Sequence, residues 1–293
     1  MTAKNEASIG VEAVADIAII SVQYNNIDDT RTLISSLANL TGIEGCTFVL
    51  VDNSTNYQAA DMIPVSRGVP FPVRVLRTPK NLYYWGGAQF GLDSLGAATN
   101  SMPSWVMICN NDVTIEDPLF LARLRALDPS TYPIVAPAIT SFPQGRQQNP
   151  MLRSPAGPLK RMKWRAYDLG YPVAKTMLRL HAMTRTLFAP IVSDRSSVNV
   201  PSDRERIYAP HGSCIIFSSA FFANGGSLDT TVPMFAEELT IAAQAERLGL
   251  PIWYCPELKV VHREHSTTGH DLTRKKYEME RSARKHYFRL VRQ

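Results

Sequence analysis

Short apolar runs alternate with amphipathic stretches along the first part of the chain. Four of these runs predict strands, at 17–22, 46–51, 73–77 and 105–109. The helical spacing of leucines predicts a helix over 29–40, and a glycine-containing turn at 81–87 precedes an expected helix over 88–98. Apolar strands that alternate with helices predict an α/β fold with a mostly parallel central sheet flanked by helices.

The second half of the chain has a less regular pattern. Strands are expected at 134–139, 211–217 and 251–261, and helices at 218–223 and 236–248. The segment 141–202 is rich in proline and basic residues and has weak periodicity. We therefore expect it to be either an insertion or a partly mobile region.

Polar residues follow three of the expected strands at the point where each strand ends. They are Tyr24-Asn-Asn26, Asp52-Asn-Ser54 and Asn110-Asn-Asp112. In open α/β sheets, ligands bind outside the carboxyl ends of the strands. The sequence therefore predicts a binding site at this edge of the sheet.

Two of these loops carry carboxylates with candidate chemistry. Asp112 can bind a divalent cation that also ligates a diphosphate, because Mg²⁺ and Mn²⁺ prefer oxygen ligands and often share substrate phosphates. A simple turn is an equally good reading of Asn110-Asn-Asp112. Asp52 can accept a hydrogen bond from a nucleobase or ribose, or else form a helix cap or an Asx turn.

Further candidates lie in the second half of the chain. Glu237 and Glu238 begin an expected helix, where adjacent carboxylates can supply a general base or simply complement the helix dipole. His262 follows a strand and is either a metal ligand or a structural residue, and the nearby His265 and His270 leave that choice open.

The composition indicates whether the protein spans a membrane and in which cellular compartment it is expected. No stretch reaches the roughly 18 uninterrupted apolar residues of a membrane helix. Residues 1–14 lack the basic start and apolar block of a signal peptide. The cysteines are far apart and lie in apolar runs, which predicts buried reduced thiols, at Cys46, Cys109, Cys214 and Cys255. We therefore expect a cytoplasmic protein.

The net charge of +5 is unevenly distributed. The segment 144–210 holds 12 Lys and Arg against 4 Asp and Glu, and 263–293 holds 9 against 4. Such segments suit a phosphate-bearing substrate, an anionic membrane surface or nucleic acid. Basic residues are mixed with apolar ones in 160–165, 177–183 and 287–292, which favours peripheral contact with a membrane or, equally, a solvated or self-associating face.

The order of the motifs resembles the family-2 glycosyltransferases, especially bacterial rhamnosyl- and galactosyltransferase-like members. The blocks that carry the resemblance are Ser21-Val-Gln-Tyr-Asn25, Val51-Asp-Asn-Ser54, Asn81-Leu-Tyr-Tyr-Trp-Gly-Gly87, Asn110-Asn-Asp-Val113, Gly212-Ser-Cys-Ile-Ile-Phe217, Gly225-Gly-Ser-Leu-Asp229, Phe235-Ala-Glu-Glu-Leu239, Arg247-Leu-Gly249 and Val260-Val-His262. Each block alone is unspecific, but the ordered set, which spans 17 to about 265, is strong.

The resemblance implies a role for each candidate. Asp112 looks like the metal ligand of a DxD-type motif whose first Asp is replaced by Asn110, and His262 matches a His that joins the metal site in related enzymes. Glu238 falls where the family usually has its catalytic Asp base, with Glu237 as the alternative. Residues expected to bind the donor nucleotide are Tyr24, Asn25, Asp52, Asn81, Gly87, Asn110 and Asn111.

The same resemblance implies a GT-A fold with a Rossmann-like nucleotide-binding half and an acceptor-binding half. Ser213 would lie near the acceptor, whereas Gln89 replaces an Asn that is usual after the glycine turn. The expected divisions are a flexible N-terminus at 1–14, a nucleotide-sugar-binding half at 15–120, an acceptor and catalytic half at 121–265 with a basic insertion at 141–205, and a basic C-terminal helical segment at 266–293.

The family is inverting, so the resemblance implies a single displacement on a UDP- or dTDP-sugar, with Mn²⁺ or Mg²⁺ on the diphosphate. The acceptor would be a hydroxyl of a glycan or of a lipid-linked sugar, in bacterial surface polysaccharide synthesis. A nucleotidyltransferase is disfavoured because the first strand has no basic glycine-rich loop after it, and a dinucleotide oxidoreductase because Gln23-Tyr-Asn-Asn26 contains no glycine. A nucleic-acid- or polyanion-binding protein, or an inactive relative, remains as the alternative.

Overall fold

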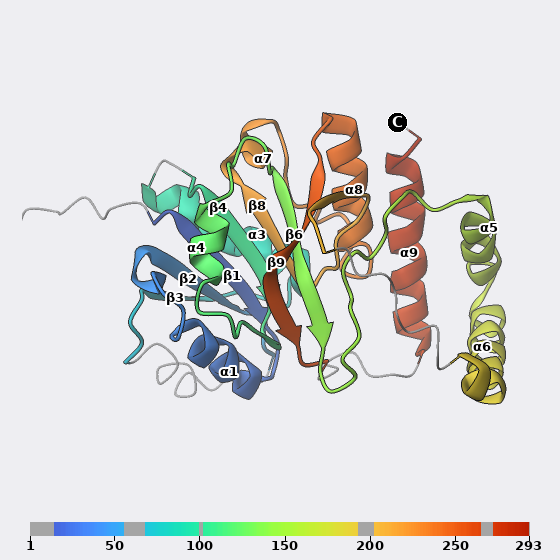
Figure 1. Ribbon diagram of the computed structural model, residues 1–293. Coiled ribbons are helices and arrows are strands. Elements are labelled where there is room, and N and C mark those ends of the chain that lie inside the picture. Colours follow the sequence, from blue (N-terminus) through green and yellow to red (C-terminus); the bar gives the residue numbers. More distant parts are fainter. Residues whose placement is uncertain (1–14, 56–67, 100–101, 193–201, 265–271, 293) are drawn as a thin grey trace, which may run out of the picture.

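The computed structural model describes residues 15–55, 68–99, 102–192, 202–264 and 272–292 (Figure 1). The expected flexible N-terminus at 1–14, the end of the basic insertion at 193–201, and His265 and His270 lie outside these residues. No helix in the described ranges is long and apolar enough to cross a membrane.

A nine-stranded sheet forms the centre of the described chain. Its strands are β1 (Ile17–Gln23), β2 (Cys46–Asp52), β3 (Val73–Arg77), β4 (Trp105–Asn110), β5 (Val113–Thr114), β6 (Ile134–Ser141), β7 (Glu205–Ile207), β8 (Cys214–Ser218) and β9 (Ile252–His262). The strand order is β3-β2-β1-β4-β8-β6-β9-β5, with β7 paired to β9.

Most of the long strands run in one direction. β1 pairs in parallel with β2 and β4, β2 with β3, and β6 with β9. β8 is antiparallel to both β4 and β6, which keeps β6 and β9 in the same direction as β1. The carboxyl ends of β1, β2, β3, β4, β6 and β9 therefore lie at one edge of the sheet, as the mostly parallel pattern predicted.

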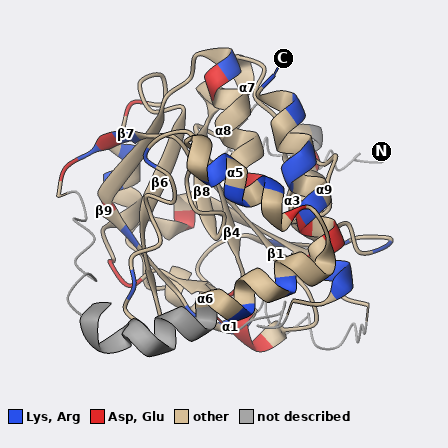
Figure 2. Cartoon of the chain, turned by 90° about the vertical axis from the view of Figure 1, so that its right-hand side faces the viewer, with Lys and Arg blue, Asp and Glu red and all other residues tan. Residues whose placement is uncertain are grey.

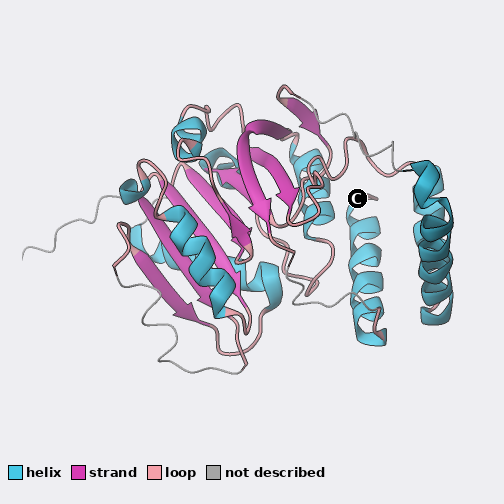
Figure 3. Ribbon diagram, turned by 60° about the horizontal axis from the view of Figure 1, so that its bottom comes forward, coloured by secondary structure: helices cyan, strands magenta, loops and turns pink. Residues whose placement is uncertain are grey.

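Helices cover both faces of this sheet (Figure 3). The covering helices are α1 (Ile27–Leu37), α3 (Tyr83–Thr99), α4 (Phe120–Arg125), α7 (Ser219–Ala223) and α8 (Glu237–Leu248), with the 3-10 turn η1 (Ile43–Gly45) before β2. α9 (Arg274–Leu290) packs on α8, and α5 (Pro158–Tyr167) and α6 (Tyr171–Val192) lie beyond α9, away from the sheet. Successive strand residues point to opposite faces. Ile17 and Ile19 accordingly pack with α1 and α4, and Ala18 and Ile20 with α3, α7 and α8.

One sequence prediction of local structure was wrong. The segment 81–87 is not a turn throughout, because α3 already begins at Tyr83 and contains Gly86 and Gly87. The basic segment, expected to be an insertion or a partly mobile region, contains α5 and α6. α5 carries apolar residues at helical spacing, at Leu159, Met162 and Ala166, but buries none of its residues, and the sequence analysis did not predict it as a helix. The four cysteines are buried and reduced, as expected.

Candidate functional site

The candidate site lies at the carboxyl edge of the parallel strands. The expected polar loops follow β1, β2 and β4, which are neighbours in the sheet, and His262 ends β9. The sheet thus gathers at one edge residues that are up to 238 positions apart in the chain, from Tyr24 to His262. Three groups of side chains can be distinguished there, at β2, at β4 and β9, and at the start of α8.

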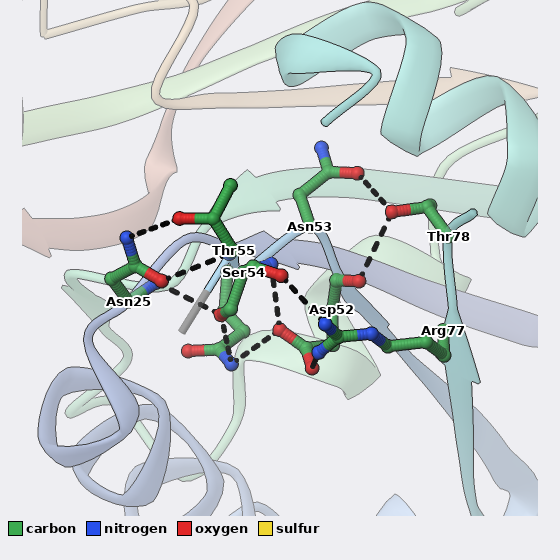
Figure 4. Close-up of polar contacts among 8 residues, drawn as sticks. Asn25, Asp52, Asn53, Ser54, Thr55, Arg77 and Thr78 are labelled. Atoms are coloured by element: carbon green, nitrogen blue, oxygen red, sulfur yellow. Dashed lines mark hydrogen bonds and ion pairs between the residues drawn. The ribbon is translucent and has the colours of Figure 1, made fainter. Parts of the chain in front are cut away.

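The first group surrounds Asp52, whose side chain is only 1% exposed (Figure 4). Its Oδ1 accepts hydrogen bonds from Gln23 Nε2 at 2.8 Å and from the Ser54 backbone N–H at 3.0 Å. Its Oδ2 is paired with Arg77 Nη1 at 2.5 Å, and Arg77 Nη2 also donates to the Ser54 carbonyl at 2.8 Å. Both oxygens of the expected nucleobase-binding carboxylate are therefore already engaged by the protein.

A second loop is tied to this carboxylate group. Asn25 adopts a left-handed backbone conformation with φ of 53°, which Asn tolerates better than most residues. Its backbone N–H donates to Ser54 Oγ at 2.9 Å, and its Oδ1 accepts from the Thr55 backbone at 3.1 Å. The loop after β1 is thus joined to the loop after β2 at Asn25, while the neighbouring Tyr24 is partly exposed.

Asn53 connects the same region to the start of α3. Its Nδ2 donates to the Tyr83 carbonyl at 2.7 Å, and its Oδ1 accepts from Thr78 Oγ1 at 2.7 Å. Asn81, expected to bind the donor, uses its Oδ1 to accept the Tyr83 backbone N–H at 2.8 Å. A Cβ at Gly87 would come within 2.8 Å of Asn53 Nδ2, so this glycine permits close packing of α3 rather than a turn.

Two of the residues after β4, Asn110 and Asn111, anchor the loop through hydrogen bonds. Asn111 Nδ2 donates to the Asn26 carbonyl at 2.9 Å and to Thr30 Oγ1 at 3.1 Å, which anchors the loop on the first turn of α1. The Asn110 backbone N–H donates to the Ser213 carbonyl at 2.9 Å. These contacts leave Asp112 as the carboxylate of the loop that the protein does not saturate.

Asp112 and His262 form the second group. Asp112 Oδ1 is buried and receives no hydrogen bond from the described residues, although His262 Nε2 lies 3.3 Å away. His262 Nδ1 lies 2.9 Å from Gln148 Oε1, and Gln148 Nε2 donates to Glu264, which fixes the amide oxygen toward the ring. With its proton on Nδ1, a neutral His262 turns the lone pair of Nε2 toward the Asp112 carboxylate.

This geometry fits a divalent cation. Two lone pairs that face each other repel unless a cation or a proton lies between them, and a carbonyl behind the distal imidazole nitrogen is the usual support of a metal-ligating His. No group of three or more His, Cys, Asp or Glu side chains that would hold a metal occurs in the described part of the chain. Asp112 and His262 would therefore provide two ligands and leave the rest to phosphate and water, as Mg²⁺ sites commonly do.

His211, which the sequence analysis did not single out, lies beside this pair. Its ring centroid is 5.7 Å from that of His262. His211 Nδ1 accepts the Ser213 backbone N–H at 3.2 Å and lies 3.0 Å from Ser213 Oγ. Burial and the neighbouring His262 lower the pKa of His211 to about 4, so the ring is neutral at pH 7. Ser213, expected on the acceptor side, is buried and bound to His211.

The two glutamates at the start of α8 form the third group. Glu238 Oε1 accepts the Gly212 backbone N–H at 3.2 Å, and a Cβ at Gly212 would come within 2.7 Å of that oxygen. Burial raises the pKa of Glu238, and burial together with Glu238 raises the pKa of Glu237 to about 8. Tyr84 of α3 donates to the Gly212 carbonyl at 3.0 Å, which holds this segment from the other side.

A three-residue segment joins the second and third groups. His211 contacts His262, Gly212 binds Glu238, and the Ser213 carbonyl accepts the backbone N–H of Asn110. The structure thus brings Asp112, His262 and Glu238 to one edge of the sheet, with Asp52 two strands away in the order β2-β1-β4. Glu237 is more deeply buried than Glu238, and Asn81 and Asn111 serve local backbone contacts.

Arg77 and His211 are the neighbours of these groups that sequence analysis missed. Arg77 is the last residue of β3, and in the parallel register it lies opposite Asp52. That pairing was available only once the order β3-β2 was known. His211 precedes the block Gly212–Phe217 and carries no motif of its own.

Known proteins match this chain in structure but not in sequence. No model of a known protein family matches the sequence, and no curated protein matches it. Solved structures do match: a 1–349 fragment of S. aureus TarS has a TM-score of 0.52 at 12% identity, covering 84% of this chain and 60% of that one. GalNAc-T7, solved with UDP, GalNAc and Mn²⁺, has a TM-score of 0.59 at 13% identity, covering 96% of this chain and 48% of that one.

A third match is the mannosyltransferase PcManGT from Pyrobaculum calidifontis, in complex with GDP-Man and Mn²⁺. Its TM-score is 0.54 at 10% identity, and the match covers 94% of this chain and 72% of that one. The fold is of the GT-A type. This confirms the predicted fold class, while the GT-A fold alone leaves open the family-2 subtype and the substrates. The chain spans about half to three-fifths of the length of GalNAc-T7 and the TarS fragment.

Proposed function

We propose that this protein is an inverting, metal-dependent glycosyltransferase that moves a sugar from a nucleotide-diphosphate donor to a hydroxyl group. The observation that carries the proposal is the Asp112–His262 pair, whose buried carboxylate oxygen receives no hydrogen bond from the described residues, at the ligand-binding edge of a GT-A fold. Among the matching structures, GalNAc-T7 contains UDP, GalNAc and Mn²⁺, PcManGT contains GDP-Man and Mn²⁺, and the TarS fragment was also solved with UDP. A UDP- or dTDP-sugar is the donor that we expect.

The donor end is supported by the arrangement around β1 and β2. We propose that Asp52 acts on the nucleobase through Arg77, whose partly exposed guanidinium it holds in place, and Asn25 holds the loop beside them. Asp112 and His262 would hold Mn²⁺ or Mg²⁺ at the diphosphate, where such an ion neutralises the charge of the leaving group. We propose that Tyr24, with its partly exposed ring beside this loop, contacts the nucleoside.

Glu238 is our candidate for the general base. It is less buried than Glu237, and it faces the Gly212-Ser213 segment that reaches the metal-side group. In the reaction that we propose, Glu238 takes the proton of the acceptor hydroxyl while that oxygen attacks the anomeric carbon from the face opposite the diphosphate. The bond from the anomeric carbon to the diphosphate oxygen breaks as the new bond forms, which inverts the configuration. A raised pKa suits this task because it strengthens the base.

The acceptor that we propose is a glycan or a lipid-linked sugar of a bacterial surface polysaccharide, and the compartment is the cytoplasm. Support comes from two features of the described chain. The four cysteines are reduced and buried, as in cytoplasmic proteins. The segment 141–205 lies next to β6 and carries the basic helices α5 and α6, which suit an acceptor with phosphate groups.

Calorimetric titration of UDP, dTDP and GDP into the protein, with and without Mn²⁺, tests the proposal. We expect Mn²⁺-dependent binding of one of these nucleotides, and we expect Asp112→Ala to abolish the metal dependence. The matched control is Asp117→Ala, which removes a half-buried carboxylate that pairs with Arg123 and accepts the Leu119 backbone N–H. Failure of the folded protein to bind any of the three would refute the glycosyltransferase and favour a polyanion-binding protein or an inactive relative.

A further inference from the structure

The helices α5 and α6 form an unusual surface on the side of the molecule away from β1–β4 (Figure 1). Large apolar side chains project into solvent there, including Leu159, which is 79% exposed, Leu169 at 75% and Met162 at 62%. Leu180 and Val173 on α6 are also exposed. Soluble proteins rarely expose a group of large apolar residues without a partner. We call Leu159, Met162, Leu169, Val173, Leu180, Lys163, Arg165 and Arg179 the α5–α6 surface.

The inner side of the two helices is firmly attached to α9. Trp164 packs edge-on against Tyr287 at a centroid distance of 6.4 Å, and the rings of Tyr167 and Tyr277 pack at a tilt with a centroid distance of 5.8 Å. Asp168 is paired with Arg284 at 2.7 Å. The outward-facing residues are therefore held in place by a specific contact on the opposite side, so their exposure follows from the packing of α5 and α6.

The charge of the α5–α6 surface has a single sign. Between residues 158 and 181 the sequence has six Lys and Arg and one acidic residue, Asp168, whose charge is compensated by Arg284. Figure 2 faces this side and shows Lys and Arg segments along α5 and the first part of α6. Lys163, Arg165 and Arg179 form no ion pair with any described residue.

An open hollow of about 600 Å³ adjoins the apolar positions. It lies between the turn Pro155-Ala-Gly-Pro158 and the side chains of Arg161, Met162 and Arg165. Arg161 Nε donates to the Ala156 carbonyl at 2.7 Å, so this guanidinium is fixed at the wall of the hollow. Two arginines beside an apolar floor suit a group with a negatively charged head and an apolar body.

We propose that the α5–α6 surface docks on a bilayer of anionic phospholipid. Leucine and methionine side chains would enter the boundary between headgroups and acyl chains, and the Lys and Arg side chains would reach the phosphates around them. A second protein chain or a soluble polyanion explains only part of the observations, because the former does not require a single sign of charge and the latter does not require exposed Leu and Met.

The orientation of the surface adds to this inference. In Figure 1, α6 lies at the end of the molecule toward which β6 and β9 point, and this is the edge that carries Asp112 and His262. A bilayer against the outer side of α5 and α6, which faces the viewer in Figure 2, would therefore reach the level of the candidate site. Docking does not depend on the proposed reaction, so the two can be tested separately.

Flotation of the full chain with vesicles measures the docking. We expect binding to vesicles that contain phosphatidylglycerol, little binding to phosphatidylcholine alone, and release as salt shortens the Debye length. Each basic residue near an anionic surface contributes roughly fivefold to partitioning. The variant Lys163→Gln/Arg165→Gln/Arg179→Gln should therefore bind at least roughly tenfold more weakly.

Two further variants make the test specific. Leu159→Ser/Met162→Ser should also weaken flotation, at unchanged charge, because it removes apolar side chains that are exposed in the free protein. The matched charge control is Arg123→Gln/Arg247→Gln/Lys259→Gln, which lies on α4, α8 and β9 and should float like the wild type. Glu238→Gln should float normally, which separates docking from catalysis.

Two outcomes would overturn the inference. One is a folded wild-type protein that stays unbound with anionic vesicles, and the other is equal weakening by the charge control. Sedimentation that shows a dimer dissolved by Leu159→Ser/Met162→Ser, without flotation, would assign the surface to a second copy of this chain instead.

Discussion

The two ends of the candidate site differ in how far the protein satisfies its own polar groups. At the β2 end, three donors hold the Asp52 carboxylate, and Arg77 neutralises it. At the other end, no residue in the described part of the chain donates a hydrogen bond to Asp112 Oδ1, and burial raises the pKa of both Glu237 and Glu238. The first end is therefore complete without a ligand, whereas the second is complete only when a ligand supplies cations or protons.

This difference predicts where substitutions should affect the stability of the fold and where they should affect catalysis. A buried group with all its partners present stabilises the fold, and losing it leaves those partners unpaired. A buried group without partners costs stability, and such costs concentrate at functional sites. Substitutions at the β2 end should thus mainly lower stability, and substitutions at the other end should mainly lower activity.

The largest effect is expected for the two glutamates of α8. Glu238→Gln should lower kcat by roughly 10² to 10⁴, because it removes the proton acceptor without changing shape. Glu237→Gln should lower kcat by less than about tenfold, since Glu237 is the more deeply buried of the two and Glu238 is the one that contacts Gly212. Steady-state kinetics on the donor identified by calorimetry measures both. The reverse ranking would assign the base to Glu237.

The second effect contrasts Asp52 with Asp112. Asp52→Ala should cost about 3 kcal/mol in the free energy of unfolding, because it removes the ion pair with Arg77 and the hydrogen bonds from Gln23 and the Ser54 backbone N–H at a buried position. Asp112→Asn should change stability by less than about 1 kcal/mol, since no described residue donates a hydrogen bond to its Oδ1. Urea denaturation compares the two. Equal destabilisation would mean that the Asp112 end is also built into the fold.

How well the sequence predicted each helix or strand depends on how deeply that element is buried. The strands β1, β2 and β4 are buried on both faces, so their continuous apolar runs could be recognised in the sequence. Because the strands were predicted to be parallel, the polar loops after them could be placed at one edge of the sheet. α5 buries no residue and was missed. Gly87 was taken for a turn because its actual neighbour, Asn53, is brought to it only by tertiary structure.

The same reasoning applies to the site. Asp52, Asp112, Glu238 and His262 stand at positions that a motif or a strand end makes visible. Arg77 is a single cation at the end of a strand, and its pairing with Asp52 required the register of β2 and β3. The sequence could not show which hydrogen bonds and ion pairs each group forms, such as those that engage both oxygens of Asp52.

A smaller effect tests the close packing at the β2 end. Gly87→Ala should cost about 1 to 3 kcal/mol, because its Cβ would lie 2.8 Å from Asn53 Nδ2 and from Val22. The matched control is Gly96→Ala in the same helix, where a Cβ meets nothing within 4 Å. The control should gain about 0.5 to 1 kcal/mol from helix propensity. Thermal unfolding of both variants decides whether α3 packs tightly against the donor end.

The smallest effect concerns pH. Burial raises the pKa of Glu237 from 4.5 to about 8, so the folded state retains a proton that the unfolded state releases. The contribution of Glu237 to stability should therefore fall as pH rises from about 4.5 to 8, and be level above that range. Up to about pH 6.5 the lowered pKa of His211 acts in the opposite direction. Between about pH 6.5 and 8, folded His211 stays neutral and the unfolded residue loses only its remaining half proton, which offsets about 0.4 kcal/mol, so a net loss of roughly 1 kcal/mol there reports the glutamates.

Glu237→Gln should flatten that pH dependence, because an amide has no proton to release. Urea midpoints of the wild type and the variant, taken at pH 6.5 and 8, measure the difference. Asp52→Asn is the contrasting variant: its carboxylate is paired with Arg77, so its removal should lower stability equally at both pH values and leave the slope intact. A wild-type midpoint that does not fall over this range would mean that the α8 glutamates are ionised in the fold, and that the polar groups at this end are already satisfied without a ligand.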